Sequence, residues 1–310
     1  MSLLMIFIDG FGLGAAGQEA NPFLKAEIPF LKSLVGENFS RESVGSGIIG
    51  PELIIKPTDA TLGVKGIPQS ATGQTVLLAG VNAAAIAGRH LSGFPTQALR
   101  KILNQNSIFK VISNSGQRAV FANTFTTEYF ETVRKGKARY SATTTAAMAG
   151  MSELRMVPDL LLGKAVYQDI TNQQLIEKGY QVPQLEPEQA ADRLVETAAM
   201  NDFTLFEYFQ TDHCGHHQDW ELAMVLLNRL DRFLGEIAGQ LQNHKMDLLI
   251  VSDHGNIEDL FIKTHTLNLV PTIALGQNAG YFKEVESLLD IYPAILKLLG
   301  VPTPPSNIVL

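Results

Sequence analysis

Short runs of apolar residues alternate with helix-like stretches along almost the whole chain. The runs are rich in Ile, Val, Leu and Phe, and such continuous hydrophobicity is typical of strands that are buried on both faces. The stretches between them favour helices that cross over between parallel strands. We therefore predict an α/β fold, a three-layer sandwich with a mostly parallel central sheet. The predicted strands cover residues 3–8, 118–123, 203–209, 247–252 and 270–275.

Helical periodicity accounts for most of the remaining sequence. The predicted helices cover residues 29–36, 72–87, 96–105, 187–200, 220–242 and 292–300. The stretch 127–185 differs, because it lacks clear periodicity and is rich in Thr, Ala and basic residues. We interpret it as a small cap or excursion over a core formed by residues 1–126 and 186–310.

Charge and cysteine content narrow the possible partners and compartment. The chain has 24 Lys and Arg against 31 Asp and Glu, so it offers no basic face for a nucleic-acid backbone. The single cysteine, Cys214, excludes an intramolecular disulfide and predicts a reducing, cytoplasmic setting. The opening apolar run is too short to cross a bilayer, so we expect no membrane attachment. The oligomeric state is left open.

Three aspartates stand at or just after the ends of predicted strands, in "IFID", "FEYFQTD" and "LIVSD". They are Asp9, Asp212 and Asp253. In open parallel sheets, functional groups gather at the carboxyl ends of the strands, so three strands could direct three carboxylates into one crevice. A single such Asp would more simply cap a helix or close a turn. The three together favour a shared site.

Five of the seven histidines lie in two short segments beside these aspartates. Asp212 and His216 are four residues apart and can reach one point if the segment is helical. His254 follows Asp253 directly, and His265 comes eleven residues later. Carboxylate and imidazole together form a ligand set suited to Zn or Mn, whereas Ca and Mg prefer oxygen alone. The pattern predicts a metal site.

The stretch "GIPQSATGQTVLLAG" leads from a Gly/Pro turn into the first turn of an apolar helix. The free N–H groups and the dipole at a helix N-terminus favour an anion such as phosphate, and Ser70 there could attack it. Taken alone, the stretch is better interpreted as an ordinary helix cap formed by Ser70 or Thr72.

Five motifs resemble those of the alkaline phosphatase superfamily in their order: "IDGFGLG", "PQSATGQT", "TDHCGHH", "SDHGNIED" and "THTLNLVP". The similarity is closest to the branch of cofactor-independent phosphoglycerate mutase and phosphopentomutase. The motifs run from residue 9 to residue 271 and so cover most of the chain. The resemblance implies an alkaline-phosphatase-like core that transfers phosphoryl groups with the help of metal ions.

The resemblance also implies a role for each matching residue. Asp9, Ser70, Asp253 and His254 would hold one divalent metal ion, and Asp212, His216 and His265 would hold a second, the metal being Mn or Zn. Ser70 would be the nucleophile, since the family places its Ser or Thr three residues before a glycine, here Gly73; Thr72 is the runner-up. His213 and His217 match no ligand position.

The implied chemistry has two outcomes for a small phosphorylated substrate. Ser70 would accept the phosphoryl group, and the phosphoserine would pass it to water in a phosphomonoester hydrolase or to another hydroxyl in a phosphomutase. Gln74 stands where the mutases have His, and the gap between Ser70 and Asp212 is too short for the inserted domain of phosphoglycerate mutase. We therefore expect a hydrolase, with a mutase as the alternative. A metal-binding protein without turnover is the alternative of another class.

Four residues are candidates for contact with the substrate. Arg134 and Arg139 lie in the basic segment "VRKGKARY" and could clamp an anion. A solvated basic loop explains that segment equally well. Asn82 and Arg89 follow the nucleophile helix and are weaker candidates.

Overall fold

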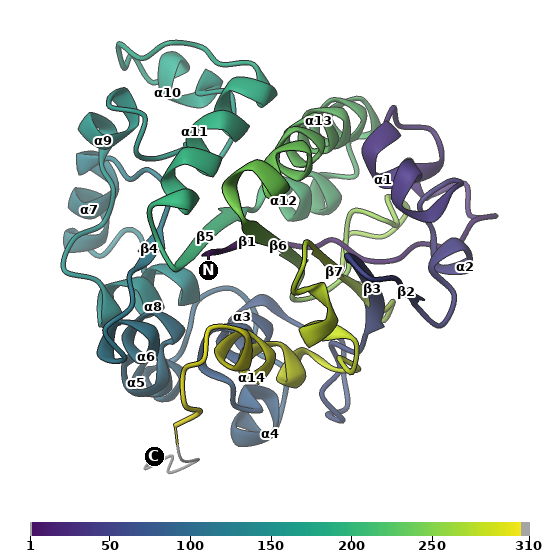
Figure 1. Ribbon diagram of the computed structural model, residues 1–310, viewed down its shortest axis with the longest axis horizontal. Helices are drawn as coiled ribbons and strands as arrows, with labels where there is room; N and C mark the ends of the chain where they lie inside the picture. The colour runs from purple at the N-terminus through teal and green to yellow at the C-terminus, as the bar shows by residue number, and fades with distance from the viewer. Residues whose placement is uncertain (1, 305–310) are drawn as a thin grey trace.

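The computed structural model describes residues 2–304 (Figure 1). One sheet with the strand order β2-β3-β7-β6-β1-β5-β4 forms its centre. The strands are β1 (Ser2–Ile8), β2 (Ile48–Ile49), β3 (Leu53–Thr58), β4 (Ala119–Phe121), β5 (Phe203–Tyr208), β6 (Met246–Val251) and β7 (Val270–Leu275). Strands β4, β5, β1 and β6 run parallel, whereas β7 pairs antiparallel with both β6 and β3. The mostly parallel sheet and the α/β class are confirmed.

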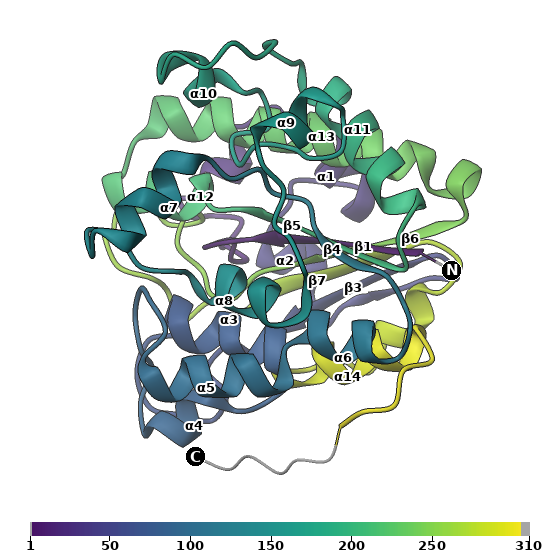
Figure 2. The same cartoon turned by 90° about the vertical axis from the view of Figure 1, so that its left-hand side faces the viewer.

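Helices cover both faces of this sheet, which Figure 2 shows nearly edge-on between two helical layers. One layer contains α3 (Ser70–Ala79), α5 (Gln97–Asn106), α6 (Ile108–Asn114), α8 (Ala142–Gly150) and α14 (Leu288–Leu298). The other contains α1 (Pro29–Val35), α11 (Pro187–Ala199) and α13 (Trp220–His244). The remaining helices are η1 (Pro22–Leu24), α2 (Arg41–Val44), α4 (Ala83–Ala87), α7 (Thr127–Arg134), α9 (Val157–Leu161), α10 (Gln173–Glu177), α12 (Gln210–His217) and η2 (Ala279–Phe282).

The central strand β1 shows why the apolar runs are continuous. Successive side chains of a strand point to opposite faces, and here each face meets a helical layer. Leu3 and Met5 belong to the apolar core on one side of the sheet, and Leu4 and Ile6 belong to the core on the other. Both sets are buried, so the strand is apolar from Leu3 to Ile8.

Strands β2 and β3 were not among the predicted strands. Strand β3 has the sequence LIIKPT, in which Lys56 and Pro57 interrupt the apolar pattern and favour a loop. The structure nevertheless pairs β3 with β7 along its whole length, with Pro57 opposite Pro271. The pairing adds an antiparallel edge to the sheet.

The helix predicted over residues 72–87 is two helices in the structure, α3 and α4. The break falls at Gly80, whose φ of +66 is the left-handed conformation that ends many helices. A Cβ atom at this position would lie only 2.4 Å from the ring of Tyr292 on α14. The prediction was wrong here because packing against a distant helix sets the boundary.

The segment 127–185, predicted as a cap, has two kinds of surroundings. Helix α8 packs against α3, α5 and α6, and its Ala142, Ala146 and Ala147 belong to the main apolar core. In contrast, α7, α9 and α10 lie at one side of the sandwich (Figure 1). The predicted domain boundaries remain a prediction, and residues 1 and 305–310 lie outside the described part. Within residues 2–304, every helix is too short or too polar to span a bilayer.

Candidate metal centre

The seven residues expected to bind metal come together at one edge of the sheet. Asp9 follows β1, and Asp253 and His254 follow β6, while Asp212 lies on α12 directly after β5. These three strands are parallel neighbours, so their carboxyl ends meet at the same edge. The other residues reach this edge from the first turn of α3, from α12 and from the loop between β6 and β7; they are Ser70, His216 and His265.

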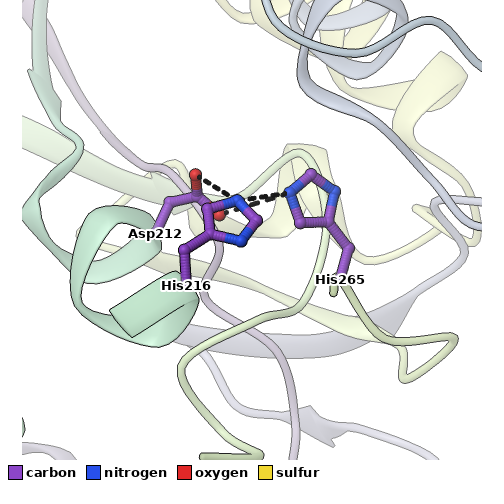
Figure 3. Close-up of side chains that lie close together, drawn as sticks. All are labelled: Asp212, His216 and His265. Carbon is purple, nitrogen blue, oxygen red and sulfur yellow. Dashed lines mark hydrogen bonds and ion pairs between the residues drawn. The ribbon is translucent and has the colours of Figure 1, made fainter. Parts of the chain in front are cut away.

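Asp212, His216 and His265 form the first group of converging ligand atoms (Figure 3). The carboxylate of Asp212 lies 3.3 Å from Nε2 of His216 and 3.4 Å from Nε2 of His265. The two Nε2 atoms are themselves 3.2 Å apart. Helix α12 produces this geometry, because it places Asp212 and His216 one turn apart on the same face.

Backbone carbonyls set the tautomer of both histidines. Nδ1 of His216 lies 2.7 Å from the carbonyl oxygen of Lys263, and Nδ1 of His265 lies 2.9 Å from that of Pro68. A carbonyl oxygen only accepts hydrogen bonds, so each Nδ1 donates its proton to the carbonyl, and a neutral ring held in this way offers the lone pair of its Nε2 to a metal ion. Histidine ligands of metal ions commonly have such a partner on their other nitrogen.

His254 is the centre of the second group. Its Nε2 lies 3.3 Å from Asp9 Oδ1, 3.4 Å from Asp253 Oδ2 and 3.0 Å from Ser70 Oγ. The imidazole is completely buried, and its burial lowers the pKa well below the ordinary value. A neutral ring in this position can offer Nε2 as a ligand.

Asp9 and Asp253 are buried together, and among the described residues neither forms an ion pair with a lysine or arginine. The pKa of both groups is raised well above the ordinary value, mainly by burial and then by repulsion from the neighbouring carboxylates. Oδ1 of Asp9 and Oδ2 of Asp253 have no hydrogen-bond partner among the described residues. Unpartnered carboxylate oxygens beside imidazole nitrogens fit divalent cations of the Mn or Zn type.

Asp212 contributes to both groups. Its carboxylate converges with His216 and His265 and also with Asp9 and His254, with all ligand atoms of each group within 4.8 Å of one another. The resemblance implied a ligand to one metal only. The Asp212 carboxylate thus lies within reach of both sets of predicted ligands.

Ser70 is the first residue of α3, and Gln69 occupies the capping position without a capping hydrogen bond. The interpretation of Ser70 as a helix cap is therefore wrong. The Thr72 hydroxyl, in contrast, donates to the carbonyl of Gln69 and accepts from the backbone N–H of Leu91, in a completely buried position. Of the two hydroxyls, that of Ser70 faces His254 and the cavity beside it.

Gly73 explains how the start of α3 approaches the metal ligands so closely. A Cβ atom at this position would lie 2.9 Å from both Cβ and the carbonyl oxygen of Asp253. Any larger residue would push the helix away from β6, and Ser70 with it. The glycine three residues after Ser70 is a packing requirement of the site.

Comparison with known proteins identifies the family. The metalloenzyme superfamily matches residues 1–303. The chain belongs to this superfamily. The 2,3-bisphosphoglycerate-independent phosphoglycerate mutase of Legionella pneumophila (strain Lens) is 32% identical over 134 residues, which cover 39% of this chain and 26% of that protein. The chain thus aligns with about a quarter of the length of the curated relatives it matches.

Solved structures show the same fold for this member of the metalloenzyme superfamily. The alkaline phosphatase from the Antarctic bacterium TAB5 has a TM-score of 0.52 at 11% identity, over 97% of this chain and 99% of that one. A phosphoglycerate mutase of Leishmania mexicana has a TM-score of 0.50 at 12% identity, over 99% and 96% of the two chains. At these identities the likeness concerns the fold, and it confirms the expected alkaline-phosphatase-like architecture.

Glu258, in the loop before His265, was not among the predicted site residues. Its carboxylate is completely buried and accepts hydrogen bonds from the backbone N–H of Gly12 and of Asn256, at 3.1 and 2.7 Å. The side chains of Thr266 and Asn268 also donate to it. Glu258 thereby joins the loop after β1 to the loop after β6, both of which carry predicted metal ligands.

Glu207 is a second residue that the sequence analysis missed. It lies on β5, is buried, and lines the cavity beside the metal centre. Burial raises the pKa of its carboxyl group to about 7, although a hydrogen bond of 3.0 Å from the Thr143 hydroxyl acts in the opposite direction. A charged residue within the apolar run "FTLFEYF" was the available signal.

Replacing Glu207 by glutamine is expected to stabilise the metal-free protein more at alkaline than at acidic pH. The folded pKa of about 7 exceeds the ordinary 4.5, so ionisation opposes folding as pH rises between these values. Above the folded pKa the penalty is about 3 kcal/mol. Urea unfolding at about pH 5 and about pH 8.5 measures the change that Glu207→Gln makes in the free energy of unfolding, with Glu196→Gln as a surface control. Equal effects of Glu207→Gln at both pH values would contradict the prediction.

The four candidate substrate contacts lie in different places. Arg139 lines the cavity beside the metal centre, whereas Asn82, Arg89 and Arg134 are not part of its lining. Asn82 instead caps α4 and donates to the carbonyl of Leu62 at 2.9 Å. Arg89 follows α4, and Arg134 ends α7.

The lining also includes three residues for which we predicted no role as a metal ligand: His213, His217 and Gln74. The amide of Gln74 donates to Oδ2 of Asp9 at 3.2 Å, so the residue that replaces the mutase histidine contacts a predicted ligand directly.

Proposed function

We propose that this chain is a metal-dependent phosphomonoester hydrolase that acts on a small phosphorylated metabolite through a phosphoserine on Ser70. The position of Ser70 supports this most directly. Its Oγ lies 3.0 Å from His254 Nε2, inside a cluster of carboxylate and imidazole ligands, and it faces a cavity. A weak nucleophile placed among metal ligands is the arrangement that activates a serine hydroxyl.

Two divalent cations, Mn or Zn, fit the two groups of ligands. One ion would be held by Asp9, Ser70, Asp253 and His254, the other by Asp212, His216 and His265, with Asp212 near both. When bound, the ions supply Lewis acidity and neutralise the charge that develops on the phosphoryl oxygens and the leaving oxygen.

The residues of the chain position the reacting groups. The free N–H groups in the first turn of α3 and the dipole of that helix favour an anionic phosphate beside Ser70. Ser70 Oγ forms the new bond to phosphorus and gives up its proton to water, while the bond to the ester oxygen breaks and that oxygen takes a proton from water as the alcohol leaves. Attack by water on phosphoserine then releases inorganic phosphate and restores the hydroxyl.

A phosphomutase is the second candidate, since the Legionella pneumophila relative is named as one. The two reactions share the transfer to Ser70 and differ in whether water or a second substrate hydroxyl receives the phosphoryl group. Gln74 in place of the mutase histidine favours hydrolysis. A metal-binding protein without turnover is the alternative of another class, and the presence of a serine at the nucleophile position disfavours it.

The compartment is also a proposal, namely the cytoplasm. Cys214 is buried, and desolvation raises the pKa of its thiol to about 12. A single buried cysteine, which has no second cysteine in the chain to pair with, is typical of proteins from a reducing compartment.

We expect the protein loaded with Mn or Zn to release inorganic phosphate from an aryl phosphate and from at least one sugar phosphate. Phosphorus NMR of the reaction mixture separates the two outcomes, because a hydrolase accumulates inorganic phosphate whereas a mutase accumulates an isomeric phosphate ester. Protein stripped of metal is the control. Lack of both products after Mn and after Zn is added would refute the proposal.

A further inference from the structure

A cavity of about 580 Å³ opens beside the predicted metal centre, and six of the residues that line it are aromatic, histidines aside. Asp9, Ser70 and Asp212 line it at the metal end. Away from the metals it is lined by Phe94, Phe121, Phe125, Tyr129, Tyr167 and Phe209. The volume is in the range of pockets that enclose a small organic ligand. Any phosphate ester with its phosphate at Ser70 would direct its alcohol part toward these rings.

The charge of the wall disfavours a second anionic group on the substrate. Lys178 and Arg139 are the basic residues of the lining, histidines aside, among the described residues. Lys178 already donates to the Tyr167 hydroxyl at 3.1 Å, and the Arg139 guanidinium lies over the Phe94 ring at 5.6 Å. Glu207 adds a buried carboxyl group to the same wall. A phosphorylated carboxylic acid would find few free cations here.

An exposed ring in the wall points to an apolar part of the ligand. Phe94 is 45% exposed at the cavity although it is a large apolar residue, so a ligand could cover it.

We infer that the substrate is a phosphomonoester whose alcohol part carries an aromatic or heteroaromatic ring, with the phosphate at Ser70 and the ring among Phe125, Tyr129 and their neighbours. This inference rests on the proposed function. It deepens that function by naming the class of the leaving alcohol. Ring stacking and edge contacts with aromatic side chains would favour a flat ring over a saturated one of similar size.

Three alkyl phosphates with similar leaving groups test the inference: phenethyl, cyclohexylethyl and ethyl phosphate. For the metal-loaded enzyme we expect kcat/KM for phenethyl phosphate to exceed that for ethyl phosphate about 100-fold, from burial of the ring. It should exceed that for the cyclohexylethyl ester about fivefold. Equal values for the phenethyl and ethyl esters, or for the phenethyl and cyclohexylethyl esters, would overturn the inference.

A matched pair of variants tests where the ring of the substrate binds. Phe125→Leu is expected to reduce the preference for phenethyl over cyclohexylethyl phosphate about fivefold, since it removes a ring from the wall. Phe130→Leu is the control, because the Phe130 ring lies 5.6 Å from that of Phe125 but does not line the cavity. Equal effects of the two substitutions would contradict the assignment of the cavity.

Phosphonate binding tests the ring site independently of the proposed hydrolase activity. Calorimetry of the metal-loaded protein with phenethylphosphonate and ethylphosphonate requires no turnover. We expect the phenethyl compound to bind at least about tenfold more tightly. If no ester is hydrolysed but this preference is found, the hydrolase proposal fails and the ring site stands. If esters are hydrolysed and the phosphonates bind equally, the ring site fails.

Discussion

Replacing Ser70 by alanine is expected to lower kcat/KM for phosphomonoester turnover by about four orders of magnitude, because the substitution removes the atom that accepts the phosphoryl group. The backbone N–H groups of α3 and the remaining metal ligands persist in this variant. Phosphate should therefore still bind, while transfer stops. Steady-state kinetics with metal analysis of the same samples separates this loss from a loss of metal.

Thr72→Val is the matched control for the nucleophile. The Thr72 hydroxyl is buried and bonded to backbone groups of Gln69 and Leu91, so we expect this variant to lose some stability but to keep its turnover per folded molecule. Near wild-type activity of Ser70→Ala would mean that water attacks the substrate directly. A large loss in Thr72→Val alone would make Thr72 the nucleophile.

Replacing Asp212 by asparagine is expected to weaken binding at both metal positions, at least about 100-fold in affinity. Its carboxylate lies 3.3 Å from His216 Nε2 and 3.4 Å from His265 Nε2, and it also converges with Asp9 and His254. His216→Ala, in contrast, should remove one metal equivalent and leave the group around His254 loaded. Metal content after dialysis at controlled free Mn or Zn measures both effects.

Asp259→Asn is the control for this comparison, since Asp259 lies on the loop after β6 and bonds to Gln18 rather than to a predicted ligand. It should keep both metals. If Asp212→Asn lost a single equivalent, the bridging position would be wrong, and the simpler assignment with His216 and His265 would hold. If the variant kept both metals at wild-type affinity, Asp212 would not be a ligand.

The parts of the fold that follow local patterns could be predicted from the sequence. Strands β1, β5, β6 and β7 lie within a residue of their predicted positions, because their apolar runs are buried on both faces. Strand β3 could not be found, since its pairing with β7 overrides the loop preference of Lys56 and Pro57. The end of α3 at Gly80 depends on Tyr292, which is more than two hundred residues away.

Part of the candidate site could also be predicted from the sequence, and part could not. The predicted ligands could be brought together from the sequence because Asp9, Asp212 and Asp253 end or follow neighbouring parallel strands. Glu207 and Glu258 were not recognised: the one signal for Glu207 is its place within an apolar run, and nothing in the local sequence of Glu258 shows that its carboxylate will be buried. The aromatic wall was also missed: its residues come from segments between 94 and 209, and only the fold brings them to one cavity.

The central claim is that Ser70 carries the phosphoryl group in a metal-dependent reaction. Acid quenching of the metal-loaded protein during turnover, followed by peptide mapping, tests it most directly. We predict a phosphorylated peptide whose modified residue is Ser70, formed with Mn or Zn and absent after the metal is removed. Turnover with metal but without phosphate on Ser70, or phosphate found on another residue instead, would contradict it.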